Sequence, residues 1–332
     1  MSKLRSLIVG AVAIGAAFAI SGAANAQAPK KVTVVSSTAG VHAPYWVGME
    51  KGFFKEAGYE VEWKMVASSS DRVTVVSSGD AVMAGTGSQA VVAAMAQGNK
   101  NFYWVGIPDG AADISGIVAR GDIKSVKDLK GKKLAVQFGG SEEIVDYIIL
   151  KNAGLDMYKD VELVNLKQSE MVQALKQGQI DAAGAWYPEY AQLQEVPGAR
   201  KIASVADTGF WEKYKQIPAP NALILSKKFV DEDPAGAKRF LAAYWKSQQW
   251  IIDNQKEAAA ISEKVSKQSQ ADWLAWEKQS VRYTRKDQLQ QMSDKGAYPV
   301  MDIMIEFMYS VIKKIDNKPK YREWVRMDLI EG

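Results

Sequence analysis

Residues 31–63 read KVTVVSSTAGVHAPYWVGMEKGFFKEAGYEVEW and change their pattern twice. The first seven residues, 31–37, are short and rich in β-branched side chains, as in a buried strand. Pro44 stands where the first turn of a helix accepts a proline, and the helical pattern stops at Gly58. Residues 59–66 then alternate apolar and polar side chains, as a strand does. The stretch is therefore predicted to form a β-α-β unit.

The same alternation continues toward the C-terminus. After a helix that Ser70 and Asp71 could cap, further strands are predicted at 80–84, 101–107, 133–137, 161–165 and 180–185, with helices between them. A strand at 221–226 precedes a long helical tail that begins at Asp233. Strands and helices that alternate with short turns predict α/β lobes, each with a mostly parallel sheet flanked by helices.

The size of the chain and the repetition of the strand-helix pattern in a second block predict two such lobes. We expect residues 27–117 and 221–332 to form a discontinuous lobe 1, and residues 118–220 to form lobe 2. The chain would cross between them near residues 117–120 and again near 218–223. Ligands favour the cleft between lobes, so the site is expected there.

Residues 1–26, MSKLRSLIVGAVAIGAAFAISGAANA, predict export. Lys3 and Arg5 precede an apolar run that closes on the small residues Ala24-Asn25-Ala26, as in a secretory signal peptide. The run is too short and too rich in Gly and Ala for a membrane anchor. No Cys follows that could carry a lipid. We expect cleavage after Ala26 and a periplasmic protein that is not lipid-anchored.

The composition excludes several functions. With 42 Lys+Arg against 38 Asp+Glu, the formal charge of +4 gives no indication of nucleic-acid binding. The chain has no Cys and one His, His42, so thiol catalysis and thiolate or multi-histidine metal sites cannot be built. No G-x-S-x-G motif is present for a serine nucleophile. We expect a monomer that is not an enzyme and uses no cofactor and no metal.

Four segments in their order resemble the substrate-binding proteins of bacterial ABC importers, in the group that handles nitrate, taurine, alkanesulfonates and thiamine-precursor pyrimidines. They are APYWVGMEKGFFKEAGYEVEW (43–63), GTGSQA (85–90), SVKDLKGKKLAVQFGGSEE (125–143) and QGQIDAAGAWYPEYA (177–191). The resemblance implies a type II periplasmic binding protein fold, whose two hinged lobes close on a small molecule. It also implies a membrane permease and its ATPase as partners.

The expected ligand contacts follow from the fold and from the resemblance. In open α/β sheets, ligands bind beyond the carboxyl ends of strands, where helix N-termini present backbone N–H groups. In the resemblance, the loops matching Gly87-Ser88 and Gly140-Ser141 approach the ligand with amides and hydroxyls. The predicted contacts are Thr38, His42, Tyr45, Ser70, Gly87, Ser88, Gly140, Ser141, Glu142, Glu143, Trp186 and Tyr187.

Several of these residues also have a purely structural interpretation. Ser141 could serve only as a helix N-cap, and His42 could be a satisfied loop histidine. Trp186 and Tyr187 could fill core space instead of forming a flat wall for the ligand. Tyr45 and Trp46 are adjacent at a helix start, so one of them is expected to face the cleft while the other packs.

Glu142 and Glu143 depart from the pattern of sulfonate-binding relatives, which have small or hydroxyl residues and a histidine there. Acids in a first helical turn complement the helix dipole, which is one interpretation. The other is that one carboxylate pairs with a ligand ammonium or a heterocycle N–H. The favoured ligand is then an amine-bearing sulfonate such as taurine, or a related zwitterion, with a nitrogen heterocycle or a plain alkanesulfonate as alternatives.

Two enzyme alternatives are weaker. Residues 85–90 fit the G-x-G-x-x-A dinucleotide motif after a strand, with Asp109 beyond the next strand, which would suit an exported oxidoreductase. However, the loop follows the third strand instead of the first, and no acid-base partner is evident. The pyrimidine-synthesising relatives of this fold depend on a Cys-rich motif, and this chain has no Cys.

Overall fold

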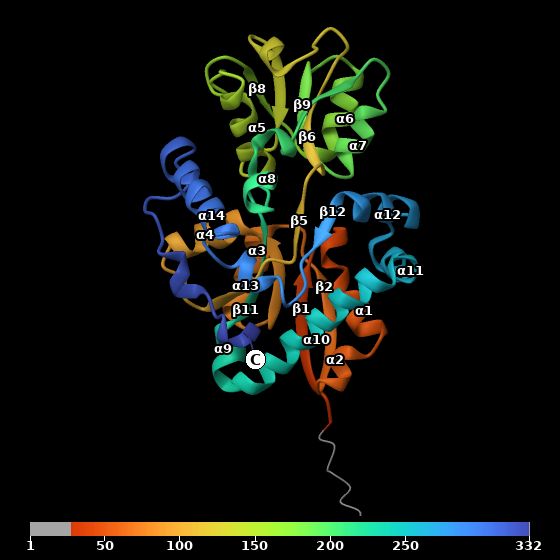
Figure 1. Ribbon diagram of the computed structural model, residues 1–332, viewed down its shortest axis with the longest axis vertical. Coiled ribbons are helices and arrows are strands. Elements are labelled where there is room, and N and C mark those ends of the chain that lie inside the picture. The colour runs from red at the N-terminus through yellow and green to blue at the C-terminus, as the bar shows by residue number, and fades with distance from the viewer. Residues whose placement is uncertain (1–27, 332) are drawn as a thin grey trace, which may run out of the picture.

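The computed structural model describes residues 28–331, so the predicted signal peptide lies outside the described residues. The strands form two five-stranded sheets and a two-stranded ladder (Figure 1). The first sheet has the order β2 (Tyr59–Met65), β1 (Lys30–Ser36), β3 (Met83–Gly87), β11 (Asn221–Ser226) and β4 (Phe102–Gly106). The second has the order β10 (Arg200–Ser204), β6 (Ser115–Ala119), β9 (Ala182–Trp186), β7 (Lys133–Val136) and β8 (Glu162–Asn165). The ladder joins β12 (Ser280–Arg282) to β5 (Asp109–Ala111).

Helices cover these sheets and account for most of the C-terminal part of the chain. The helices associated with the first sheet are α1 (Ala43–Glu50), α2 (Phe53–Glu56), α3 (Ser69–Ser78), α4 (Ser88–Ala96), α9 (Lys227–Glu232), α10 (Pro234–Asp253), α11 (Gln255–Ser266), α12 (Gln270–Gln279), α13 (Gln288–Gln291), α14 (Ala297–Glu306) and α15 (Asp328–Glu331). Those of the second sheet are α5 (Ser141–Asn152), α6 (Gln168–Lys176) and α7 (Glu189–Gln194), and α8 (Phe210–Tyr214) lies between the two parts.

Both faces of each sheet are buried, as the predicted α/β class requires. Val34 and Val35 are neighbours in β1 but belong to two different apolar clusters, because successive side chains of a strand point to opposite faces. Leu134 and Ala135 of β7 divide in the same way. The molecule therefore has two lobes, each a sheet between two helical layers, which we call lobe 1 (the sheet of β1) and lobe 2 (the sheet of β6).

The prediction of mostly parallel sheets is confirmed, because a single strand in each five-stranded sheet runs against the other four. In lobe 1, β1 is parallel to β2 and β3, but β11 is antiparallel to β3 and β4. In lobe 2, β7 is parallel to β8 and β9, but β6 is antiparallel to β9 and β10. The reason is that β6 and β11 are the strands by which the chain enters each lobe from the other one.

These two entering strands fix how the lobes face each other. Asn221, the first residue of β11, pairs with Gly87 at the carboxyl end of β3. Ser115, the first residue of β6, pairs with Trp186 at the carboxyl end of β9. Since each strand arrives from the other lobe, the carboxyl ends of the parallel strands in both lobes face one junction. We call this region the lobe junction.

The first crossing lies earlier than expected. Residues 115–119 already pair within lobe 2, so the chain crosses at 112–114 instead of near 117–120. The predicted boundary after residue 117 falls inside β6, whereas the boundary before 221 coincides with the start of β11. The predicted helix after Pro44 also divides into α1 and α2, because Gly52 adopts a left-handed conformation between them (φ 75°).

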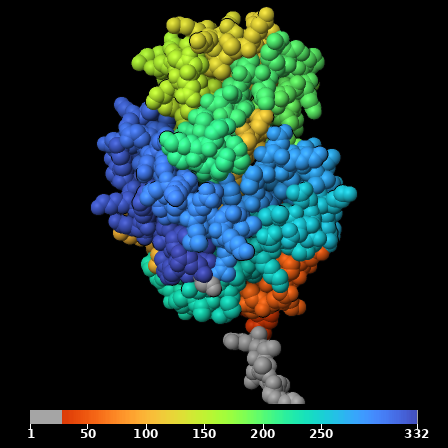
Figure 2. Space-filling model, viewed as in Figure 1, coloured from red at the N-terminus to blue at the C-terminus, as the bar shows by residue number. Residues whose placement is uncertain are grey.

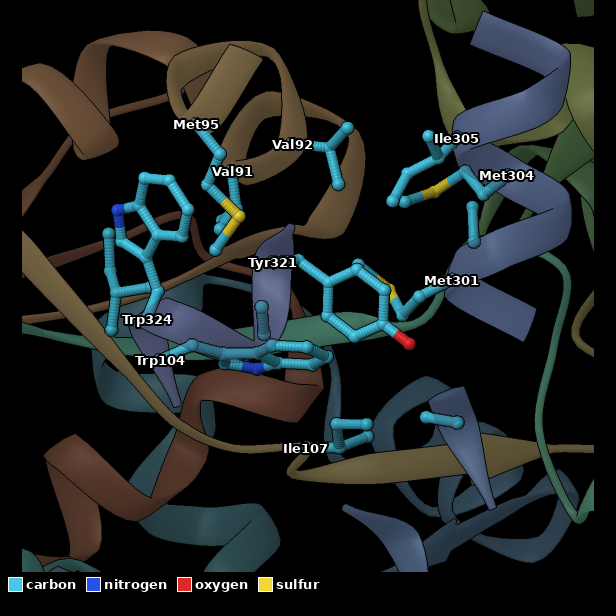
Figure 3. Close-up of a cluster of buried hydrophobic side chains, with 14 of the residues drawn as sticks. Val91, Val92, Met95, Trp104, Ile107, Met301, Met304, Ile305, Tyr321 and Trp324 are labelled. Atoms are coloured by element: carbon cyan, nitrogen blue, oxygen red, sulfur yellow. The ribbon is translucent and has the colours of Figure 1, made fainter. Parts of the chain in front are cut away.

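One apolar cluster extends across the lobe junction. Its lobe 1 part packs α4 against α14 around the fully buried Trp104, whose ring centroid lies 6.1 Å from that of Tyr321 (Figure 3). Ile144 and Ile148 of α5, in lobe 2, belong to the same cluster. The C-terminal residues lie on the front of the lower part, beneath the yellow and green residues of lobe 2 (Figure 2). The structure therefore shows the lobes in contact.

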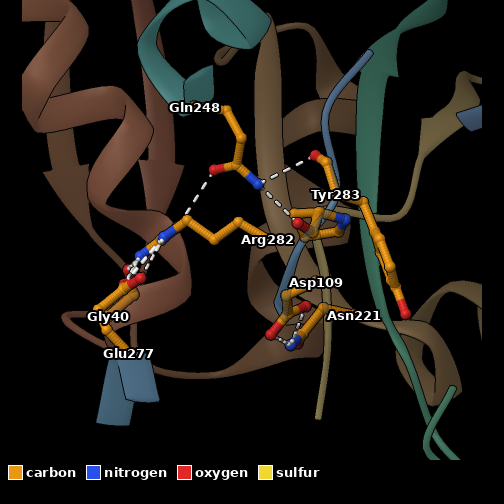
Figure 4. A network of polar contacts seen from close by, with 8 residues as sticks. Gly40, Asp109, Asn221, Gln248, Glu277, Arg282 and Tyr283 are labelled. Carbon is orange, nitrogen blue, oxygen red and sulfur yellow. Dashed lines mark hydrogen bonds and ion pairs between the residues drawn. The ribbon is translucent and has the colours of Figure 1, made fainter. Parts of the chain in front are cut away.

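A polar network holds the first crossing in place (Figure 4). β12 pairs with β5, and Gln248 of α10 donates to the carbonyls of Pro108 and Tyr283 at 2.6 and 3.2 Å. Asn221 donates to both carboxyl oxygens of Asp109, at 3.0 and 3.3 Å. Since Asp109 precedes the first crossing and Asn221 follows the second, this contact connects the two crossing segments.

The buried Asp109 should make stability depend on pH. Burial raises the pKa of Asp109 to about 6, against about 3.9 when unfolded. The contribution of protonated Asp109 to the free energy of unfolding is therefore fully present below about pH 4 and is lost as the pH rises through about 6. Asp109→Asn keeps an acceptor for Asn221 without the charge. We expect the free energy of unfolding of this variant to gain more than about 1 kcal/mol over wild type between pH 5 and 7.5. Urea titrations across this pH range measure the free energy of unfolding of both proteins. A constant difference between them at every pH would contradict the prediction.

Candidate ligand-binding site

Two hydrogen bonds connect the lobes at the lobe junction. The Gln89 side-chain amide, in the orientation that satisfies its hydrogen bonding, donates to the carbonyls of Gly140 and Gly139 at 3.2 and 3.3 Å. The Tyr187 hydroxyl donates to the Asp272 carbonyl at 3.0 Å. The loops that follow β3, β7 and β9 therefore meet here, at the strand ends where a ligand is expected in this kind of sheet. This region is the candidate site.

The structure places the predicted lobe 1 residues in unequal environments. Thr38 is exposed in the bend after β1, and Ser70 is exposed in the first turn of α3. That helix is capped by Ser68, whose hydroxyl accepts from the Asp71 amide, and not by Ser70 or Asp71 as expected. Thr38 and Ser70 are thus at the carboxyl ends of β1 and β2, and their side chains reach solvent.

His42 and Tyr45 are buried beneath these loops. Only a glycine at position 85 leaves room for the imidazole, because a Cβ there would lie 2.5 Å from His42 Nδ1. Burial, together with the positive charges of Arg72 and Arg282, lowers the pKa of His42 well below its usual range, so the ring is neutral. Its Nδ1 has no hydrogen-bond partner among residues 28–331.

Tyr45 and Trp46 do not divide between cleft and core as predicted. Both are buried, with exposed fractions of 0% and 3%. Tyr45 packs on Tyr244, with ring centroids 5.2 Å apart. Its hydroxyl has no partner within the described part of the chain, and neither does the Trp46 indole nitrogen. The two side chains can both be buried because α1 is enclosed by β2, α10 and α11.

The backbone amides expected to hold the ligand are largely used within the protein. The Gly87 amide donates to Ser69 Oγ at 3.4 Å, and the Ser88 amide to the Pro220 carbonyl at 3.1 Å. The Gly140 amide donates to the Gln137 carbonyl at 3.0 Å. Each of these three amides already has a partner within the protein, and its contact with a ligand stays a prediction.

The hydroxyl and aromatic residues at the junction are partly buried. Ser88 Oγ lies 3.3 Å from Met304 Sδ, and Ser141 is the first residue of α5, whose N-cap is Gly140. Ser141 is thus not the N-cap. The Trp186 ring lies against Gly140, where a Cβ would approach it to 3.3 Å, and Trp186 and Tyr187 are both half-buried. The structure brings Gly140, Trp186 and Tyr187 together at the edge of lobe 2.

Glu142 and Glu143 differ in their surroundings. Glu143 accepts from the Gly139 amide at 2.7 Å and from the Tyr158 hydroxyl at 3.2 Å, so it holds the loop that precedes α5. Glu142 is buried, with an exposed fraction of 1%, and its Oε1 has no partner among the described residues. Of the two, Glu142 is the one with hydrogen-bonding capacity unused by the protein.

Asp146 lies one helical turn beyond Glu142 on the same face of α5 and was not predicted. It is fully buried against β9, where a Cβ on Gly184 would lie 1.7 Å from Asp146 Oδ2. Neither of its oxygens has a partner within residues 28–331. Burial, and then the neighbouring Asp146, raise the pKa of Glu142 well above its usual range, although a hydrogen bond with Ser115 acts in the opposite direction.

Sequence reasoning also missed Arg72 and Gln89. Arg72 follows the serine run at the start of α3, and Gln89 follows Ser88 within the glycine loop. A positive charge next to a predicted helix start was the available signal for Arg72. The residues that the structure describes contain no group of three His, Cys, Asp or Glu side chains placed to hold a metal ion. None of the helices among residues 28–331 is long and apolar enough to cross a membrane.

Comparison with known families identifies the group. The sequence model of the NMT1/THI5-like family matches residues 39–258, and the chain belongs to this family. A Brucella abortus (strain 2308) protein named as a binding protein is 27% identical over 242 residues, which are 70% of this chain and 72% of that protein. A Bacillus subtilis (strain 168) protein named for aliphatic sulfonate binding is 26% identical over 225 residues, 66% of this chain and 65% of the other.

Solved structures show the same fold. The periplasmic aliphatic sulphonate binding protein of Escherichia coli aligns with a TM-score of 0.74 and 16% identity, over 90% of this chain and 92% of its own. The periplasmic nitrate-binding protein of Synechocystis PCC 6803 aligns with a TM-score of 0.65 and 18% identity, over 91% and 88%. A desulfurization enzyme also aligns, with a TM-score of 0.67 and 16% identity over 90% and 98%. The chain thus has the periplasmic binding protein fold, as predicted.

Proposed function

We propose that this protein is the extracytoplasmic solute-binding component of a bacterial ABC importer. It captures a small organic molecule at the lobe junction and delivers it to a membrane permease and its ATPase. The fold, the family and the names of the relatives support this assignment. The predicted signal peptide of residues 1–26 supports a periplasmic location, and we propose that the mature protein is a monomer.

The proposed ligand is an amine-bearing sulfonate such as taurine, or a related zwitterion. The observation that carries this choice is Glu142, a buried carboxyl group whose Oε1 has no partner in the described chain. A buried polar group left without a hydrogen bond costs about 1–3 kcal/mol, and a ligand ammonium would remove that cost. A nitrogen heterocycle with N–H donors could satisfy Glu142 in the same way, whereas a plain alkanesulfonate has no N–H group to donate to it.

Capture is proposed to occur by closure of the lobes. Lobe 1 would move relative to lobe 2, with the two crossing segments as the hinge. The contact between Asp109 and Asn221 joins these segments, so they would move as one unit. The hydrogen bonds from Gln89 and Tyr187 would then form only in the closed state.

A binding role without turnover is favoured over the enzyme alternatives. The desulfurization enzyme shares the fold alone at 16% identity, and this chain has no Cys for covalent chemistry. An oxidoreductase would use the backbone amides of the G-x-G-x-x-A loop to bind a dinucleotide. Here the Gly87 and Ser88 amides donate to Ser69 Oγ and to the Pro220 carbonyl instead. We therefore propose that the ligand leaves the protein chemically unchanged.

A thermal-shift screen of the mature protein tests this function. The panel contains amine-bearing sulfonates, plain alkanesulfonates, alkylamines, pyrimidines, carboxylates and inorganic oxyanions. A ligand at 100 times its Kd adds about 2.7 kcal/mol to the free energy of unfolding, or about 5 °C in Tm. We expect 2-aminoethanesulfonate or a related zwitterion to give the largest shift. Stabilisation by inorganic oxyanions alone, or consumption of the ligand during incubation, would contradict the proposal.

A further inference from the structure

Arg72 is a buried cation that has no carboxylate partner among the described residues. Its exposed fraction is 5%, and none of the ion pairs within residues 28–331 includes it. Nη1 donates to the carbonyls of Val66 and Ala67 at 2.7 and 3.0 Å, and Nη2 donates to Ser69 Oγ at 2.8 Å. Nε is buried and has no partner. Of its five N–H donors, these bonds leave the Nε hydrogen and one Nη2 hydrogen unassigned.

These contacts place Arg72 on the side of lobe 1 that faces lobe 2. The Ser69 hydroxyl that accepts from Arg72 also accepts from the Gly87 amide, at the carboxyl end of β3. Two residues later, Gln89 donates to the loop of lobe 2 that precedes α5. A short chain of contacts therefore connects Arg72 with the lobe junction.

The two lobes bury ionisable side chains of opposite kinds that have no oppositely charged partner among the described residues. Lobe 1 has Arg72 without an acid, and lobe 2 has Glu142 and Asp146 without a base. Burial of a charge is costly unless the charge is paired and hydrogen-bonded. The other buried cation of lobe 1, Arg282 of β12, shows the usual arrangement, because it is paired with Glu277. Arg72 differs from Arg282 in this respect.

We propose that Arg72 binds the acidic end of the ligand, so that lobe 1 selects the acid and lobe 2 selects the amine. This inference rests on the proposed function and adds the residue and the lobe for the acidic end, since the amides of Gly87, Ser88 and Gly140 already donate within the protein. A guanidinium with two free N–H groups suits a sulfonate or carboxylate, which accepts two parallel hydrogen bonds. A ligand with both ends would contact both lobes at once.

The neutral His42 is compatible with this assignment. It lies close enough to Arg72 for the guanidinium charge to lower its pKa, and its Nδ1 has no partner. An uncharged ring adds no competing charge to the acidic end. Exposed Lys314, which approaches Gly139 at the same junction, has no ion-pair partner among the described residues either, but water can solvate it.

The experiment compares three probes on wild type and three variants by calorimetry. The probes are 2-aminoethanesulfonate, ethanesulfonate and ethylamine. Arg72→Gln removes the charge, Arg72→Lys keeps the charge without the guanidinium geometry, and Lys314→Gln is the matched control for loss of an exposed charge. Melting temperatures establish that each variant is folded. The probe series separates a binding role from a merely structural one, because distortion of the loop would weaken all three probes.

Arg72→Gln should weaken both sulfonates by about 10-fold to 150-fold and leave ethylamine unchanged. Arg72→Lys should fall between wild type and Arg72→Gln, and Lys314→Gln should change each affinity less than about 3-fold. Equal loss for all three probes, or no loss for the sulfonates, would overturn the assignment of Arg72 while leaving the proposed function in place. If wild type bound none of the probes, the proposed ligand class would fail together with this inference.

Discussion

Arg282→Met should lower the free energy of unfolding by about 3–5 kcal/mol, because it leaves the buried Glu277 carboxylate without its partner. Both side chains are almost completely buried, at 2% and 3% exposed. Arg282 Nε donates to the two carboxyl oxygens at 2.8 and 3.0 Å (Figure 4). The same guanidinium donates to the Gly40 carbonyl at 2.8 Å and to Gln248 Oε1 at 3.1 Å. Its loss therefore also releases the loop that carries His42.

Urea unfolding of three proteins measures this effect. The double variant Arg282→Met with Glu277→Leu is the matched control, because it removes both charges and leaves neither ion alone. We expect the double variant to recover more than half of the loss, since a buried ion pair can often be replaced by apolar side chains without net cost. A loss below about 1 kcal/mol for Arg282→Met alone would show that the pair does not stabilise the hinge region.

Much of the fold could be predicted from local sequence patterns. β11 was predicted at residues 221–226, where it is found. Short β-branched runs and glycine stops act within a few residues, so a sequence shows them directly. What the patterns could not show was the direction of β6 and β11, because strand direction depends on which lobe the chain has just left.

Contacts between distant residues were also beyond the sequence. β5 and β12 are three residues each and pair beside the first crossing, and neither carries enough alternation to indicate a strand. The contact of Asp109 with Asn221 links segments more than a hundred residues apart. No local rule predicts such a pairing, and the network that holds the crossing was therefore missed.

The candidate site, like the fold, could be predicted from the sequence only where local patterns decide it. The sequence indicated that the start of α5 lies at the site, but two adjacent helical residues point in directions about 100° apart, so it could not choose between Glu142 and Glu143. The structure separates them because the Gly139 amide and the Tyr158 hydroxyl take Glu143. Asp146 was missed because its burial depends on β9, which only the tertiary structure brings against α5.

Glu142→Gln should weaken the binding of an amine-bearing ligand by about 10-fold to 150-fold, the loss of a hydrogen bond to a charged group. Glu143→Gln is the matched control, since its carboxyl group holds the loop before α5 and should influence amine and non-amine ligands alike. Because burial raises the pKa of Glu142, an ammonium that ionises it should release a proton on binding. Affinity should therefore rise with pH in wild type and lose this dependence in Glu142→Gln. Equal affinities of Glu142→Gln and wild type would contradict the role of Glu142.

The central claim is that lobe 2 recognises a ligand amine through Glu142. Calorimetric titration of wild type and Glu142→Gln, each with the best zwitterion of the thermal-shift panel and with its deaminated analogue, tests this claim as a closed cycle. We predict that wild type prefers the amine by about 10-fold or more and that Glu142→Gln has no preference. If wild type binds the deaminated analogue as tightly as the amine, Glu142 only complements the helix dipole of α5, and the ligand is a plain anion.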